Sequence, residues 1–371
     1  MGLLLGKQIA SRGGWEVIWM ECLQIESLVP ELNPKAGQSH PIMIVASDQQ
    51  KYFLKRQMVR FENKKNNAAI WINENAVFFQ ESLVSQIARR LKIPTPETAI
   101  IHIDKLTLKA MTELQFKYHI SEGYYFATKM ISDNDSDVTR LANNLLLERK
   151  AKIPYAANQW NALMKKIINT DDIPKIIGLD LFTLNYDRFS NIGNVLLQKA
   201  GINRYLIAID FGHCFASPCW ADPNSPADYT KKLEILHQNL IDFSKPIEVR
   251  MLAHNIVFQY NVLEGNNRIY LGLIFDSLVK LLDFTAGNPF TDIVDAIESI
   301  SDPELVAMLQ ATPDEWIITP GTQQQEYKEF LLRQRFMVRP IINELADAKQ
   351  FPTIHGREEL SWPTELNTNI Q

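Results

Sequence analysis

Cysteine is scarce in this chain, and long apolar runs are missing. Cys22, Cys214 and Cys219 are the three cysteines among 371 residues, an odd and sparse set that argues against the disulfide framework of a small secreted protein. We therefore expect a reducing compartment, the cytoplasm. No apolar run approaches the roughly 20 residues that a membrane-crossing helix needs, so we expect no membrane partner.

Excess charge is also missing. The formal net charge is -5, and no run rich in lysine or arginine occurs, which disfavours nucleic acid as a direct partner. Apolar residues make up 46% of the composition, enough for a well-filled core. The length favours two domains or one large bilobed unit. We expect a disordered start over 1–14, an N-lobe over 15–130, a C-lobe over 131–350 and a tail over 351–371.

The predicted elements change character along the chain. The first third is β-rich, with strands at 41–46 and 51–55 around a turn at 47–50, a loop at 61–75, a helix at 76–91 and strands at 99–103 and 124–126. Beyond about residue 133, apolar residues recur at helical spacing over 141–149, 160–168, 176–184, 271–282, 290–300 and 326–345. This order predicts an α+β fold whose N-terminal part carries the sheet.

A lysine and a glutamate in the first third form a candidate pair. Lys55 ends the predicted strand 51–55, where it could equally be an edge lysine that limits aggregation. Glu81 falls on the apolar face of the predicted helix, where a carboxylate is costly unless a cation meets it. Kinases use such a strand lysine and helix glutamate to orient nucleotide phosphates.

The loop before the first strand of that hairpin is a candidate phosphate cover. It contains Gly37, Ser39 and His40 just before Pro41, with one glycine rather than a glycine-rich pattern. Backbone N–H groups and the Ser39 hydroxyl could reach phosphate oxygens there. An ordinary turn explains the same residues equally well.

Two acids and an amide follow on adjoining strand ends in the second half of the chain. Asp187 precedes an apolar strand that starts after Asn194, and Asp210 opens an Asp-Phe-Gly sequence at the end of the next strand. This order predicts Asp187 as the carboxylate for an acceptor hydroxyl and Asp210 as a magnesium ligand beside a nucleotide. Asn194 and Asn191 are alternative amide ligands for the metal.

Neighbouring residues have more than one possible role. Arg188 could contact a transferred phosphoryl group, since its fork of donors suits that task, or form a surface salt bridge. His213 follows the Asp-Phe-Gly sequence and could be a phosphate contact or a core histidine. Phe189 is most simply a core residue.

Five segments together resemble the HipA-like kinase family, the group that includes bacterial toxin kinases. They are 37–41 with the strand that ends at Lys55, 79–81 with 88–96, 185–197, 209–213 and 312–316. The resemblance runs from about residue 35 to 345. Its two most specific motifs surround Asp187 and Asp210.

The resemblance implies a bilobed protein-kinase-like fold that binds ATP and Mg²⁺ between its lobes. By position, Lys55 and Glu81 are the implied ion pair, Asp187 the catalytic aspartate and Asp210 the metal ligand. It implies a serine/threonine protein kinase, toxin-like in type, with a protein substrate and a cognate partner or antitoxin protein. Ser39 is a candidate for autophosphorylation.

Two alternatives stay open at the level of sequence. A small-molecule or lipid kinase of the same fold would keep the residues and change the acceptor. A kinase-like binding module with weak catalysis, a pseudokinase, would keep nucleotide binding alone. The spacing between Asp187 and either asparagine, together with Phe189, mildly favours the pseudokinase. The full set of Lys55, Glu81 and the two aspartates opposes it.

Overall fold

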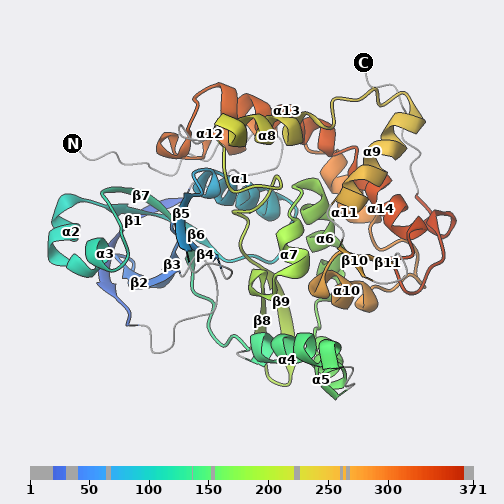
Figure 1. Cartoon of the computed structure of the whole chain (residues 1–371), viewed down its shortest axis with the longest axis horizontal. Coiled ribbons are helices and arrows are strands. Elements are labelled where there is room, and N and C mark those ends of the chain that lie inside the picture. The colour runs from blue at the N-terminus through green and yellow to red at the C-terminus, as the bar shows by residue number, and fades with distance from the viewer. Residues whose placement is uncertain are drawn as a thin grey trace.

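The structure is a computed structural model that describes residues 20–30, 41–63, 68–135, 137–151, 155–220, 226–259, 262–264 and 268–362. A β-rich N-terminal part precedes a mainly helical C-terminal part, and the two lie at opposite ends of the view in Figure 1. This arrangement confirms the predicted α+β organisation, in which the sheet comes first.

The N-terminal part is built around a closed barrel. Its five strands follow the order β1-β2-β3-β7-β6, with bounds Glu21–Leu28, Ile42–Ala46, Lys51–Leu54, Gly123–Lys129 and Thr98–Ile103. All neighbours are antiparallel except β1 and β6, which are parallel. Alternate residues such as Ile42, Ile44 and Ala46 point inward, which is the period expected of half-buried strands. The predicted strands at 41–46 and 51–55 are thus present.

Four elements of the N-terminal part were not predicted. The expected loop at 61–75 is wrong, because β4 (Met58–Asn63) and β5 (Ala68–Asn73) form an antiparallel hairpin. Residues 64–67 of the polar run that suggested a loop lie outside the described residues. Two short helices, α2 (Lys105–Ala110) and α3 (Thr112–Phe116), follow β6 and lie at the outer end of the barrel in Figure 1.

Helix α1 (Val77–Arg90) matches the predicted helix at 76–91. It ends with Lys92 in the left-handed region (φ 54°), while the N–H groups of Lys92 and Ile93 donate to the carbonyls of Arg89 and Ala88. This is the Schellman pattern that satisfies the last carbonyls of a helix.

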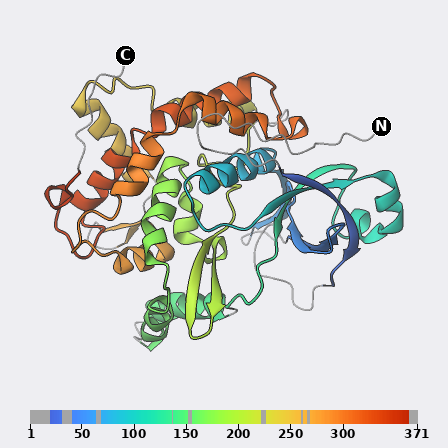
Figure 2. The same cartoon turned by 180° about the vertical axis from the view of Figure 1, so that it is seen from behind.

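The apolar side chains of α1 pack with the C-terminal helices, whereas the barrel interior forms a separate apolar cluster. Figures 1 and 2 show α1 between the barrel and the C-terminal helices.

The C-terminal part holds the remaining helices and two hairpins. The helices are α4 (Asp137–Ala151), α5 (Tyr155–Met164), α6 (Ile173–Phe182), α7 (Tyr186–Ser190), α8 (Pro226–His237), α9 (Pro246–Gln259), α10 (Leu273–Leu278), α11 (Thr291–Glu298), α12 (Asp302–Gln310), α13 (Thr322–Gln334) and α14 (Val338–Asp347). The hairpins are β8 (Val195–Ala200) with β9 (Asn203–Ala208), and β10 (Val262–Glu264) with β11 (Arg268–Tyr270). The single helix expected over 326–345 is two, because α13 ends at Gln334 and α14 begins at Val338.

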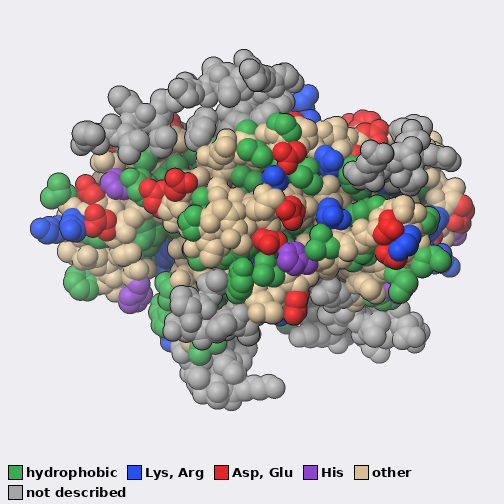
Figure 3. Space-filling view, turned by 90° about the horizontal axis from the view of Figure 1, so that it is seen from above, with side chains coloured by type: hydrophobic (Ala, Val, Ile, Leu, Met, Phe, Trp, Pro, Cys, Tyr) green, Lys and Arg blue, Asp and Glu red, His purple; other side chains and the backbone are tan. Residues whose placement is uncertain are grey.

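Charge is mixed over the face seen from above. Figure 3 shows acidic and basic side chains interspersed there among polar and apolar ones. Within the described ranges, no helix is both long and apolar enough to span a bilayer.

Candidate active site

Lys55 lies at the centre of a charged cluster between the two parts of the molecule. It follows β3 directly, and its Nζ lies 3.1 Å from Oε1 of Glu81 on α1 and 3.1 Å from Oδ1 of Asp210 after β9. The Glu81 side chain is 1% exposed, whereas 29% of the Asp210 side chain remains accessible. The structure therefore brings together three of the residues singled out in the sequence.

The ionisation of this cluster follows from its charges. Burial opposes charge on Lys55, but Asp210 and Glu81 outweigh it and hold the pKa of Lys55 above its ordinary value. Burial raises the pKa of Glu81, with the neighbouring Asp210 charge adding to the effect. Burial acts in the same direction on Asp210, yet Lys55 and His213 keep the pKa of Asp210 below its usual value. Asp210 is thus the ionised, partly accessible carboxylate of the cluster.

The backbone at Asp210 is held in an unusual conformation. Asp210 has φ 65°, in the left-handed region that side chains other than glycine seldom adopt. Gly212, two residues on, lies against α1, where an added Cβ would be 3.1 Å from a methyl of Val77 and 3.5 Å from Oε1 of Glu81. The tight approach of this segment to α1 places Asp210 over Lys55.

Asp187 receives hydrogen bonds from both candidate asparagines. Nδ2 of Asn194 donates to its Oδ2 at 2.6 Å, and Nδ2 of Asn191 donates to the same oxygen at 3.4 Å. Asn194 is 2% exposed, whereas Asn191 is exposed and its Oδ1 accepts from the N–H of Gly193 at 3.0 Å. The Asn194 amide is therefore the one built into the site.

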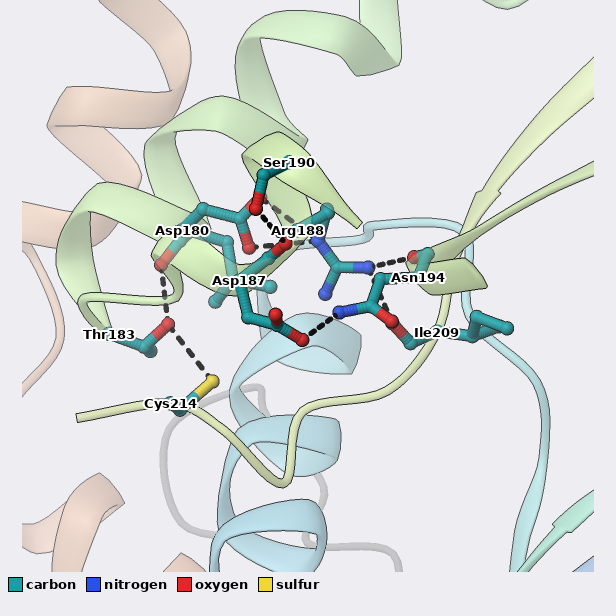
Figure 4. Close-up of polar contacts among 9 residues, drawn as sticks. Asp180, Thr183, Asp187, Arg188, Ser190, Asn194, Ile209 and Cys214 are labelled. Carbon is teal, nitrogen blue, oxygen red and sulfur yellow. Dashed lines mark hydrogen bonds and ion pairs between the residues drawn. The ribbon is translucent and has the colours of Figure 1, made fainter. Parts of the chain in front are cut away.

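Arg188 differs from the expected phosphate contact. It is fully buried, and its Nε donates to both carboxylate oxygens of Asp180 on α6 at 3.0 and 2.9 Å (Figure 4). Its Nη1 donates to the carbonyls of Asn194 and Ile209. Burial raises the pKa of Asp180 to about 6, against the opposing effect of the guanidinium. Arg188 thereby ties the segment of Asp187 to Asn194, just before β8, and to Ile209, just after β9.

His213 lies beside the site with a partner that sequence reasoning missed. Its Nε2 is 3.7 Å from Oε1 of Glu74, a buried residue just before α1. Burial opposes protonation, but Glu74, Asp187 and Asp210 together raise the pKa of His213. Only the position of His213 after Asp-Phe-Gly could have pointed to it, since Glu74 is 139 residues earlier in the chain.

Other predicted residues are placed more simply. Phe189 is buried and packs edge-on against Phe275, as expected of a core residue. Gly37, Ser39 and His40 lie outside the described residues, so the cover loop stays a prediction.

Comparison with known proteins adds a distant neighbour. No protein-family model matches the chain, and no curated protein does. Among solved structures, the chain is similar to the crystal structure of a Helicobacter pylori proinflammatory kinase, CtkA, with 14% identity and a TM-score of 0.44. The similarity covers 87% of this chain and 96% of that one.

Proposed function

We propose that this protein is an ATP- and Mg²⁺-dependent phosphotransferase that acts on a hydroxyl acceptor. The observation that carries the proposal is Lys55, which is held at 3.1 Å from both Glu81 and Asp210. Phosphoryl transfer depends mainly on positioned charge, and this cluster offers a cation and an ionised carboxylate at the junction of a barrel and a helical part.

The residues of the cluster fit a nucleotide and its metal. Lys55 would bind phosphate oxygens, with Glu81 holding its ammonium. Asp210 and Oδ1 of Asn194 would hold Mg²⁺, since carboxylate and amide oxygens suit that ion. When bound, the nucleotide would supply the phosphoryl group and the metal would supply charge at the developing anion.

Asp187 would bind and orient the acceptor hydroxyl. Its carboxylate is half-exposed, and one oxygen is fixed by the Asn194 amide at 2.6 Å. The other can accept the hydroxyl proton, which is the task of a general base within hydrogen-bond reach. Arg188 would act by positioning, through its bonds to Asp180 and to the carbonyls beside Asn194 and Asp210.

We propose a serine or threonine side chain of a protein as the acceptor, following the resemblance to HipA-like kinases. Transfer of label from γ-labelled ATP distinguishes the acceptors: label on protein supports this acceptor, whereas label in an extracted small molecule supports a metabolite or lipid acceptor. Label on residues 37–41 of the chain itself would support the expected autophosphorylation of Ser39.

The catalytic assignment is tested by turnover. Asp187→Ala and Asp210→Ala should each lower phosphoryl transfer by about 10²–10⁴-fold, the usual contribution of such groups. Asp171→Ala is the matched control, because Asp171 is an exposed aspartate of the same helical part. Turnover in the Asp187 variant equal to wild type would remove the catalytic role.

The two asparagines separate in the same assay. Asn194→Ala should raise the Mg²⁺ concentration needed for half-maximal rate about tenfold, whereas Asn191→Ala should change it less than about twofold. The reverse order would move the metal ligand to Asn191.

A further inference from the structure

Helix α1 carries a row of buried polar side chains that face the C-terminal helices. Ser82 Oγ lies 3.0 Å from Oγ1 of Thr312, and Nε2 of Gln86 donates to the carbonyl of Met308 at 2.9 Å. One turn further on, Arg90 pairs with Glu304 of α12 at 2.7 Å. Polar residues in a buried face are costly unless bonded, so this row fixes the position of α1 against α12.

Gln80, next to Glu81, is the most connected member of that row. Its Nε2 donates to the carbonyl of Gly212 at 2.5 Å, directly beyond Asp210 and Phe211. Its Oε1 accepts from Nζ of Lys232 on α8 at 2.8 Å and from the hydroxyl of Tyr327 on α13 at 2.6 Å. One amide thus joins α1 to the Asp-Phe-Gly segment and to two helices far away in sequence.

Lys232 extends this network along the segment after Asp-Phe-Gly. Its Nζ also donates to the carbonyl of Phe215 at 3.1 Å and to that of Ser217 at 2.7 Å. The side chain is fully buried, and its ammonium lies 5.6–5.8 Å from the ring centres of Tyr327 and Phe215. Its hydrogen-bond partners among the described residues are thus an amide oxygen and two backbone carbonyls.

We propose that Lys232 and Tyr327 are positioning residues, which act through Gln80 to hold Glu81 and Asp210 in register around Lys55. The inference rests on the proposed function and names residues outside the site that hold its side chains in place. Moving α1 relative to the Asp-Phe-Gly segment would separate Glu81 from Asp210, and the shared bonds at Gln80 and Gly212 oppose that movement. A rearrangement of α8 or α13, caused by a bound partner for example, would therefore reach the site.

The Lys232 ammonium is buried among uncharged partners, as a positioning role requires. Burial lowers the pKa of Lys232 to about 7, and the groups that face it are Cys214, Cys219 and Tyr327. Three acceptor oxygens use all three N–H donors of the protonated form. Loss of one proton would leave one of these oxygens without its hydrogen bond from Lys232.

The test compares Lys232→Met with wild type and with Lys231→Met, the neighbouring exposed lysine on α8. Hydrogen exchange over residues 79–84 and 211–217 should rise about tenfold in Lys232→Met, while the barrel strands at 42–54 stay unchanged. Phosphoryl transfer per folded molecule should fall about tenfold, mainly in kcat, because misplaced metal and acceptor groups weaken the transition state. A merely structural role would lower the melting temperature and leave kcat per folded molecule intact.

The outcomes distinguish failure of this inference from failure of the proposed function. Wild-type exchange and wild-type kcat in a folded Lys232→Met protein would overturn the inference. If Lys232→Met does not fold, Tyr327→Phe decides, since it removes one hydroxyl and should raise exchange over the same segments by a smaller factor; no change there overturns the inference. If wild type itself transfers no phosphate, the proposed function fails, and exchange still tests the coupling.

Discussion

Two lysines lie beside neighbouring residues of α1, Lys55 with its side chain 11% exposed and Lys232 fully buried, and their surroundings shift the two pKa values in opposite directions. Lys55 meets two carboxylates, which raise its pKa despite burial. Lys232 donates to the amide oxygen of Gln80 and to two carbonyls, and burial lowers its pKa to about 7. The carboxylates beside Lys55 favour a permanent charge on it, whereas the uncharged partners of Lys232 leave its ammonium close to neutrality at pH 7.

The difference also shows in access. Lys55 shares its cluster with Asp210, whose side chain is 29% exposed, so ligands can reach it. Lys232 is fully sealed among α1, α8 and α13. The two environments meet at Gly212, whose carbonyl accepts from Gln80 and whose α-carbon faces Glu81. We therefore treat the first as the chemical cluster and the second as its support.

The largest effect is expected from Lys55→Met. Removal of the cation leaves Glu81 as a buried carboxylate without its partner, which costs about 3–5 kcal/mol of unfolding free energy. Phosphoryl transfer should fall below detection. Urea unfolding measures the stability loss, and Lys55→Met with Glu81→Gln should recover most of it without recovering activity. Failure of the double variant to recover would show that Lys55 matters by packing.

The second expectation concerns pH and Lys232. Its pKa is about 7 in the folded chain against an ordinary 10.5, so between these values the unfolded chain binds more protons. The unfolding free energy of wild type should therefore rise with pH there, by up to about 1.4 kcal/mol per pH unit from this group. Below pH 7 the group should give no slope.

Lys232→Met should remove the pH dependence of the unfolding free energy that comes from Lys232 and leave the contributions of other groups in place. Buried Cys214 and Tyr327 also titrate on unfolding, with pKa values raised by burial, but they are common to both proteins and cancel in the difference. Urea unfolding of both proteins at pH 7, 8 and 9 gives that difference directly. Parallel curves would mean that Lys232 stays protonated, as Lys55 does.

Gly212→Ala tests the point where the two environments meet. The added methyl would lie 3.1 and 3.3 Å from the Val77 methyls, so α1 must move by a few tenths of an ångström. We expect a cost of about 1–3 kcal/mol, the usual range for overpacking, together with weaker nucleotide binding. Calorimetry with a non-hydrolysable ATP analogue measures the binding. Gly201→Ala cannot serve as the control, because Gly201 has φ 62° and an alanine there would be strained. Unchanged nucleotide binding in Gly212→Ala would show that the packing at Gly212 does not affect the site around Lys55.

Sequence alone predicted the charged cluster better than its support. Glu81 stood out because it is a carboxylate on an apolar helix face, and Asp187 and Asp210 stood out by motif. Arg188 was misjudged because its partner Asp180 gives no local signal. The β4–β5 hairpin was missed because the sequence between its strands is polar, as the sequence of a loop is. Gln80, Lys232 and Tyr327 belong to no motif in the sequence. Lys232 is 152 positions and Tyr327 is 247 positions after Gln80, so only the folded structure brings them together.

The smallest effect is expected from Tyr327→Phe, which probes the support without touching any charge. The substitution removes the hydroxyl that donates to Oε1 of Gln80 at 2.6 Å, while Lys232 still donates to the same oxygen. Because the acceptor keeps one partner, we expect a loss of about 0.5–1.5 kcal/mol, the net value of one hydrogen bond. Urea unfolding measures it, and in Lys232→Met the same substitution should cost more, because Gln80 Oε1 then loses its last donor. Equal costs in both backgrounds would mean that Lys232 and Tyr327 do not act through Gln80.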